Sequence, residues 1–193
     1  MRYVFLFLLC LNFAFSYGVK EINMAINYVG LEEKIAPRVL YTIVKIESNF
    51  NPLVISFLTD KKNALYFKSL ENENIKIKVS QYSLNKKRWI VSIHPNTLRR
   101  ARGIAKLLIR DGFSIDVGLA QINSVNFKTE EIDYIFEPVY NLRKSAKILK
   151  LCYKRKNKNI QKTIECYNYG YRNRPSNPYY KRFYEHFKKE FGG

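Results

Sequence analysis

The chain has 193 residues, of which 47% are hydrophobic and 15% aromatic. This excludes a chain that is disordered throughout, and the length favours one domain with a well-packed core over two. With 34 Lys and Arg against 16 Asp and Glu, the formal net charge of +18 favours an anionic polymer as partner. Nucleic acid, an anionic membrane surface and an acidic cell-wall polymer all satisfy this charge.

Residues 1–16 predict a segment that directs export. Arg2 is followed by an apolar run, and residues 14–16 (Ala-Phe-Ser) form a small-x-small cleavage pattern. The run is shorter than the about 18 to 20 apolar residues that cross a bilayer, so we prefer a cleaved signal peptide to an uncleaved anchor. No later stretch is apolar enough to span a membrane. We expect a periplasmic or otherwise exported protein whose mature domain covers residues 17–193.

Export changes the interpretation of the three cysteines. Cys10 falls inside the predicted signal peptide, which leaves Cys152 and Cys166 as an even pair in an oxidising compartment. A disulfide between two neighbouring helices and two buried free thiols both fit this pair. The Cys and His residues lack metal-ligand spacing, so we expect no metal and no other cofactor.

The predicted elements begin with helices at residues 19–29 and 32–48. The second is the clearest helix of the chain, because its apolar residues recur at spacings of three and four. It ends before Pro52, since the residue preceding a proline is driven out of helical geometry. Its apolar positions are Ile35, Ala36, Val39, Leu40, Ile43 and Val44.

Within residues 74–95 the apolar period changes to two. Two alternating runs flank a polar turn at residues 84–87, which predicts a β-hairpin. Helices return at residues 96–110, 138–154 and 160–169.

A short helix is predicted to open at residues 118–123, and a last one lies toward the end of residues 175–191. The predicted fold class is therefore mainly α, one helical domain with a small β-hairpin insertion at about residues 74–95.

Glu47 is the first candidate for catalysis. It falls on the apolar side of its helix, close in direction to Leu40, where partial desolvation would raise the pKa of its carboxyl. A carboxyl that stays protonated near neutral pH can protonate the leaving oxygen of a sugar. The alternative is a solvent-facing glutamate at a helix end, and helical position alone does not choose between the two.

Three short blocks follow one another along the chain. They are Glu-Ser-Asn-Phe-Asn-Pro at residues 47–52, Gly-Leu-Ala-Gln-Ile-Asn at 118–123 and Tyr-Asn-Tyr-Gly at 167–170. Together they resemble the soluble lytic transglycosylases, a family related to goose-type lysozymes, over about residues 35–185. The chain is most similar to the small specialised members that accompany type IV secretion, conjugation and related envelope machines. The resemblance implies a lysozyme-like fold and a carbon–oxygen lyase that cuts the glycan strands of peptidoglycan.

Carried over to this chain, the resemblance assigns Glu47 as the catalytic acid and base. Ser56 corresponds to a serine that contacts sugar, and Gln121 to a glutamine that lines the cleft beside the acid. Asn123, where the family often has methionine, joins the substrate-binding residues. Ala120 also replaces a usual methionine, which implies a smaller wall for the sugar.

The tyrosine and asparagine of the third block, Tyr167 and Asn168, correspond to the pair that closes the other side of the cleft. Either Tyr179 or Tyr180 corresponds to a later tyrosine that hydrogen-bonds near the acid, and we take Tyr180 as the substrate-binding residue.

No second carboxylate stands out, although Asp60 and Asp116 are candidates; Asp116 is also placed to cap a short helix. The resemblance implies that Glu47 protonates the oxygen between N-acetylmuramic acid and N-acetylglucosamine. The same carboxylate then takes the C6 hydroxyl proton, so that a 1,6-anhydro ring closes. The expected partners are glycan strands and components of a secretion or conjugation apparatus, and no nucleic acid.

Two alternatives stay open at this stage. One is a muramidase that hydrolyses the same bond with the same glutamate. The other is a non-catalytic basic protein that binds the cell wall or DNA.

Overall fold

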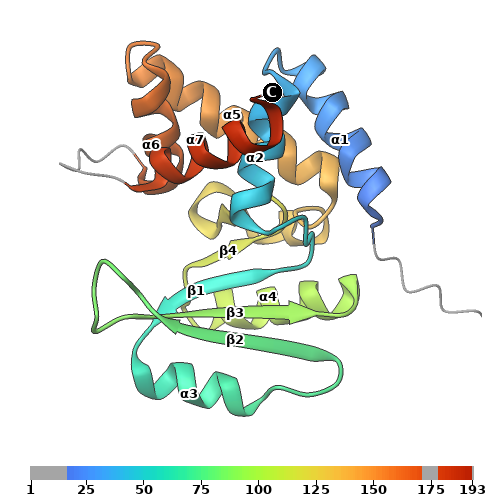
Figure 1. The fold of residues 1–193 in the computed structure, drawn as a ribbon. Helices are drawn as coiled ribbons and strands as arrows, with labels where there is room; N and C mark the ends of the chain where they lie inside the picture. Colours follow the sequence, from blue (N-terminus) through green and yellow to red (C-terminus); the bar gives the residue numbers. More distant parts are fainter. Residues whose placement is uncertain (1–16, 171–177, 193) are drawn as a thin grey trace, which may run out of the picture.

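The computed structural model describes residues 17–170 and 178–192, which form two lobes (Figure 1). The predicted signal peptide lies outside these residues. The helical lobe holds five helices, which are α1 (Val19–Glu32), α2 (Pro37–Glu47), α5 (Pro138–Arg155), α6 (Ile160–Tyr169) and α7 (Pro178–Phe191). Within the described ranges, no helix combines the length and the apolar character that crossing a bilayer requires.

The connection between α1 and α2 corrects the predicted helix at residues 32–48. Helix α1 runs on to Glu32, Lys34 takes a left-handed φ of 53°, and α2 begins only at Pro37. Proline is favoured in the first turn of a helix, where its missing N–H would have no intrahelical partner. Ile35 and Ala36 therefore lie in the connection, although their spacing matches the helix that follows.

The second lobe is a five-stranded antiparallel sheet with the strand order β2-β3-β1-β4-β5. The predicted hairpin is present at one edge of this sheet. The strands are β1 (Ile55–Thr59), β2 (Ile75–Gln81), β3 (Trp89–Pro95), β4 (Ile115–Val117) and β5 (Ile122–Asn123).

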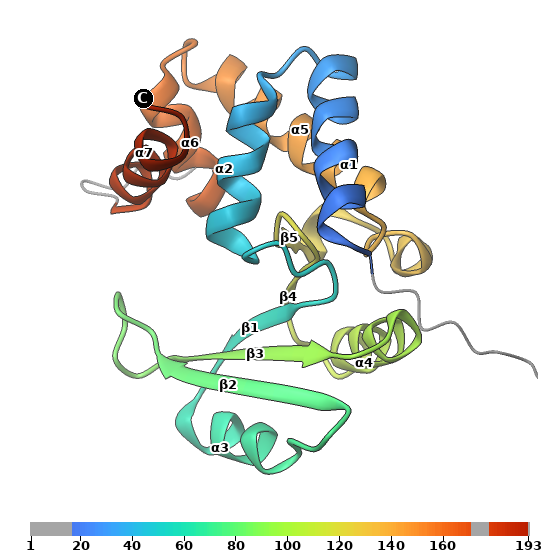
Figure 2. The same ribbon diagram turned by 45° about the vertical axis from the view of Figure 1, so that its right-hand side comes forward.

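Helices α3 (Lys61–Ser69) and α4 (Leu98–Arg110) cover one face of the sheet (Figure 2). That face is apolar: Phe57, Ile77 and Val91 are buried in one core cluster with Ala64 of α3 and Ala105 of α4. The opposite face of the sheet points toward the helical lobe.

The segment at residues 118–123 does not form the predicted short helix. Gly118 and Gln121 have positive φ values of 77° and 46°, which interrupt helical geometry, and a tight turn leads into β5. Two 3₁₀-helices follow, Ser124–Asn126 and Thr129–Asp133. The predicted fold class, mainly α with a small β element, is confirmed, and the β element is larger than one hairpin.

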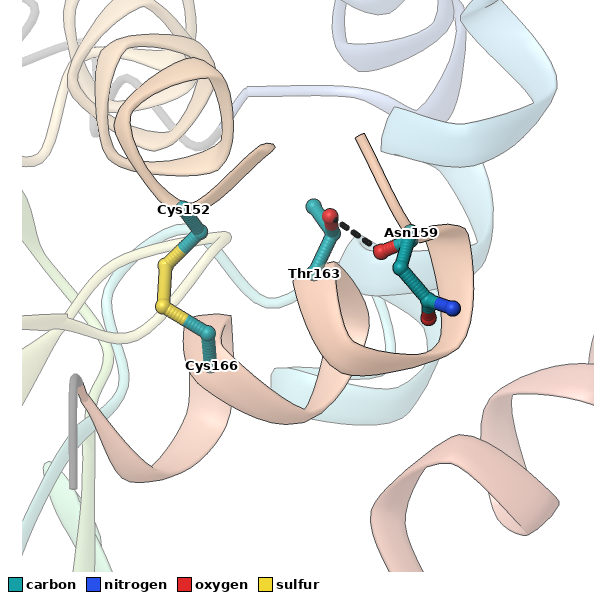
Figure 3. Close-up of a disulfide and its surroundings, with 4 residues drawn as sticks. All are labelled: Cys152, Asn159, Thr163 and Cys166. Carbon is teal, nitrogen blue, oxygen red and sulfur yellow. Dashed lines mark hydrogen bonds between the residues drawn. A yellow bond between two sulfur atoms is a disulfide. The ribbon is translucent and has the colours of Figure 1, made fainter. Parts of the chain in front are cut away.

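A disulfide joins Cys152 of α5 to Cys166 of α6 (Figure 3). Between them, Asn159 caps α6: its side chain accepts a hydrogen bond from Lys162 N at 2.9 Å, and its carbonyl accepts one from Thr163 Oγ1 at 2.6 Å. Of the two alternatives for the cysteines, the structure has the disulfide. It ties the end of α6 to α5.

Candidate active site

A cleft of about 810 Å³ lies between the two lobes. Ligand cavities typically measure about 300 to 1,000 Å³, so this cleft is large enough for part of a polymer. Residues of α2, α6 and α7 line it from the helical lobe, and residues of β1, β3, β4 and β5 line it from the sheet. The three sequence blocks meet here, since Glu47, Gln121, Tyr167 and Asn168 all line the cleft.

Glu47 is the last residue of α2, and its Oε1 accepts a hydrogen bond from the Tyr179 hydroxyl of α7. Burial raises the pKa of Glu47 to about 7. The hydrogen bond from Tyr179 and the positive charge of Arg182 act against this rise, whereas the negative charge of Asp116 adds to it. Near neutral pH a large share of this carboxyl is therefore protonated and can serve as an acid.

The first sequence block forms the turn that ends α2 at the acid. Asn49 and Phe50 have left-handed φ values of 48° and 63°, which stop the helix. Asn51 then holds the chain as it enters β1: its Oδ1 accepts from Leu53 N at 2.9 Å, and its Nδ2 lies 3.1 Å from His94 Nδ1. The block thus fixes the acid between the helical lobe and the sheet.

The second block forms the turn before β5. A Cβ on Gly118 would come within 2.3 Å of Asn141 Nδ2, so the turn needs glycine at this point. The buried Asn141 amide donates to Val117 O at 3.0 Å, and its Oδ1 accepts from Ala120 N at 2.8 Å. Gln121 Nε2 donates to Gly118 O at 3.0 Å. The side chain of Gln121 is thereby held rigidly in the cleft wall.

The third block lies in the last turn of α6. The Tyr167 hydroxyl donates to Ala120 O at 2.8 Å and lies 2.9 Å from Ser145 Oγ. Burial, followed by the charge of Glu47, raises the pKa of Tyr167 above its ordinary value, so it stays a neutral donor. Asn168 hydrogen-bonds to Glu47, which lowers the pKa of that carboxyl. This block connects the acid to the turn at residues 118–121.

The sheet contributes Ser56, Asp116 and Asn123, which are cross-strand neighbours and all line the cleft. Asn123 Nδ2 donates to Asp116 Oδ1 at 2.9 Å, and burial raises the pKa of Asp116 to about 6. Because Asp116 lies in β4, its predicted role as a helix cap is wrong. Asp60 is instead the cap of α3, accepting from Asn63 N at 2.9 Å. Of the two carboxylates proposed from the sequence, Asp116 is the one in the cleft.

The structure decides which of the two tyrosines at the start of α7 lies beside Glu47. Tyr179 is buried and contacts Glu47, whereas the ring of Tyr180 stacks on Tyr184 with centroids 6.3 Å apart. The choice of Tyr180 is therefore corrected to Tyr179.

Sequence reasoning missed Arg182, whose guanidinium lies 5.3 Å from the centroid of the Tyr179 ring and lines the cleft. Its spacing of three from Tyr179 was the available signal, because residues three apart share a helix face.

The family profile described as "Transglycosylase SLT domain" matches residues 24–186, which span both lobes and every cleft residue named above. Searches of curated proteins and of solved structures gave no match. Members of this family are lytic transglycosylases, lyases that act on peptidoglycan. With its helical lobe, its small sheet and a protonatable glutamate between them, the chain belongs to the transglycosylase SLT domain family and is a peptidoglycan lytic transglycosylase with a lysozyme-like fold.

Proposed function

We propose that Glu47 is the single acid and base with which this enzyme cuts the bond between N-acetylmuramic acid and N-acetylglucosamine. The observation that carries this proposal is a carboxyl with a pKa of about 7 on the cleft wall. The protonated form can donate to the glycosidic oxygen. The carboxylate form is stabilised by hydrogen bonds from Tyr179 and Asn168, so it is ready to take a proton back.

The proposed reaction balances without water. The bond between C1 of N-acetylmuramic acid and the glycosidic oxygen breaks, and that oxygen gains the proton of Glu47. The 2-acetamido group of the substrate stabilises the cation at C1. The C6 oxygen then bonds to C1 and its proton passes to Glu47, which leaves a 1,6-anhydro ring and the acid in its starting form.

Product masses test this route. Muropeptides released by the wild-type protein are expected to be lighter by one water than the reducing-end products of hydrolysis. Glu47→Gln keeps the shape of the side chain, but its amide is too weak an acid to protonate the glycosidic oxygen, so it is expected to release no soluble fragments. Lysis by Glu47→Gln at the wild-type rate would remove Glu47 from the mechanism.

Hydrolysis of the same bond, as a second reaction of this transglycosylase, is the second candidate, and the position of Asp116 in the cleft favours it. Most glycoside hydrolases use two carboxyl groups. The pKa of Asp116 is about 6 and that of Glu47 is about 7. Asp116 is therefore ionised over a pH range in which much of Glu47 is protonated. Loss of activity in Asp116→Asn, together with reducing-end products from the wild type, would favour hydrolysis over ring closure.

We also propose that the mature domain, residues 17–193, is exported and opens the wall locally for an envelope-spanning machine. The similarity of the three blocks to specialised members of the family supports this role. Cross-linking of the inactive Glu47→Gln protein in intact envelopes is expected to capture components of a secretion or conjugation apparatus. Cross-links confined to enzymes of general wall synthesis would contradict it.

A further inference from the structure

A row of polar side chains crosses all five strands of the sheet. Strand pairing sets Lys78 opposite Ser92, Ser92 opposite Ser56, Ser56 opposite Asp116, and Asp116 opposite Asn123. Residues paired across a sheet lie on the same face, and four of these five line the cleft. Neighbouring strands lie about 4.8 Å apart, so the row extends for about 19 Å.

The half of this row nearest β2 comes from the β2–β3 hairpin. Ser92 Oγ of β3 lies 3.0 Å from Ser56 Oγ of β1, which joins this half to the catalytic side. Ile90 lies two residues from Ser92 on β3, and Leu58 lies two residues from Ser56 on β1. Ile90 and Leu58 pair with each other, and both line the cleft. This surface therefore alternates hydroxyl and apolar groups, as do the edges and faces of a sugar ring.

The turn of the hairpin closes the end of this surface. Tyr82 and Leu84 both line the cleft, and Leu84 is 48% exposed. The turn is held by hydrogen bonds from Tyr82 N to Arg88 O at 2.9 Å and from Arg88 N to Asn85 O at 2.8 Å. The Arg88 guanidinium also donates to Leu58 O at 3.1 Å. The turn is thus a preorganised wall with apolar groups facing the cleft, which reduces the ordering that binding requires.

We propose that the β2–β3 hairpin adds glycan subsites to the cleft. In these subsites the Ser92 hydroxyl hydrogen-bonds to sugar, and Ile90, Tyr82 and Leu84 contact the apolar ring faces. Lys78, at the edge of the sheet, meets a carboxylate of the stem peptide. The occupant is the glycan strand because this surface continues the cleft and ends in a cation, which suits a polysaccharide that carries anionic stem peptides. The choice of occupant rests on the proposed function.

The length of the glycan substrate provides the test. We expect the double variant Tyr82→Ala/Leu84→Ala to lower kcat/KM on strands of many repeats, relative to the shortest cleavable fragment, by about tenfold, equivalent to about 1.4 kcal/mol. The matched control is Leu65→Ala/Tyr66→Ala on α3, where the same residue types are 52% and 60% exposed. This control is expected to keep the wild-type ratio. The proposal is overturned if the Tyr82/Leu84 variant keeps the wild-type ratio of kcat/KM on long and short substrates, whether or not both values fall.

A binding measurement makes the test independent of the reaction. Long uncut strands are titrated into the Glu47→Gln protein with and without the two hairpin substitutions. We expect the substitutions to weaken binding about tenfold in this background, in line with the loss in kcat/KM. Equal affinities would reject the added subsites even if Glu47 proves to be the acid. If Glu47→Gln still cut the strands, the assignment of the acid would fail, and the strand-length ratio of the Tyr82/Leu84 variant would still test the added subsites.

Discussion

At the scale of single residues, the protonation of Glu47 is set by opposing effects. Burial raises the pKa of its carboxyl, while the hydrogen bond from Tyr179 and the charge of Arg182 lower it. The result, about 7, lies where one group can act as acid and then as base. The neighbours on α7 thus adjust the reactivity of a residue on α2.

The first prediction concerns the pH profile. Because Glu47 must be protonated to act as an acid, activity is expected to fall as pH rises through about 7. Arg182→Gln removes a charge that lowers this pKa, so the alkaline limb should move to higher pH. Lys181→Gln, which removes a charge that pairs with Glu185, is the control and should leave the limb in place. A limb that moves to lower pH in Arg182→Gln contradicts the prediction.

The second prediction concerns stability. The folded-state pKa of Glu47, about 7, exceeds its ordinary value of 4.5, so the folded protein binds more protons than the unfolded chain between these values. Stability conferred by the neutral carboxyl is therefore lost as pH rises through this window. Glu47→Gln cannot ionise, so at pH about 8 its free energy of unfolding should exceed that of the wild type by about 2 kcal/mol, after allowance for solvent access. At pH about 4 it should show no such gain.

Urea unfolding at the two pH values measures this difference. Glu190→Gln, at an exposed position of α7, is the control and should show no such pH-dependent gain. An equal effect of Glu47→Gln at both values would mean that the folded protein does not hold this carboxyl in its neutral form.

At the scale of elements, the disulfide adjoins the part of the cleft wall that α6 forms. Tyr167 and Asn168 directly follow Cys166, which is bonded to Cys152 of α5. The third prediction is that Cys152→Ala/Cys166→Ala lowers the free energy of unfolding by about 3 kcal/mol, the value typical of a loop of this length. It should also reduce kcat under conditions where the variant is folded. Wild-type kcat in the folded variant would show that α5 and α6 position these residues without the bond.

The turn at Gly118 gives the fourth prediction. Gly118→Ala is expected to cost about 2 to 4 kcal/mol, because the new methyl group would collide with the buried Asn141 amide at a positive φ. Gly112→Ala is the matched control: its φ is 83°, but no atom lies within 4 Å of the added carbon. It should cost about 1 kcal/mol, the backbone strain alone. Similar losses in both variants would exclude the collision as the cause.

The elements that the sequence predicted are those with a local signal. The edge hairpin alternates polar and apolar residues because one of its faces is open to the cleft, and α4, α5 and α6 show three-four spacing. β1, β4 and β5 were missed, since strands this short are held by partners far away in the sequence. The helix face of Glu47 and its sequence block together singled it out as the candidate acid, and the structure places it on the cleft wall. Arg182 was not found from the sequence, because its approach to Glu47 depends on how α7 packs against α2.

At the scale of the whole molecule, the chain carries an excess of positive charge, and its cleft contains two carboxyl groups. The net charge of +18 attracts an anionic polymer from a distance, while Glu47 and Asp116 are shielded by burial. Family membership removes the non-catalytic alternative. We therefore expect the charge to aid substrate capture.

The fifth prediction follows from this net charge. Added salt is expected to raise KM for intact peptidoglycan, because screening weakens attraction between the exposed charges. It should change kcat much less, since the acid is buried. The control substrate is a neutral chain of N-acetylglucosamine, whose binding should respond weakly to salt. An equal response of both substrates would exclude long-range attraction as the cause.

The hydrogen bond between Tyr179 and Glu47 joins residues 132 positions apart. Glu47 is synthesised before Tyr179, so the pair can form only after the ribosome has added the residues between them. A polypeptide cut short before α7 would carry the glutamate but neither Tyr179 nor Arg182. The hydrogen bond between Glu47 and Tyr179 therefore depends on the synthesis of α7.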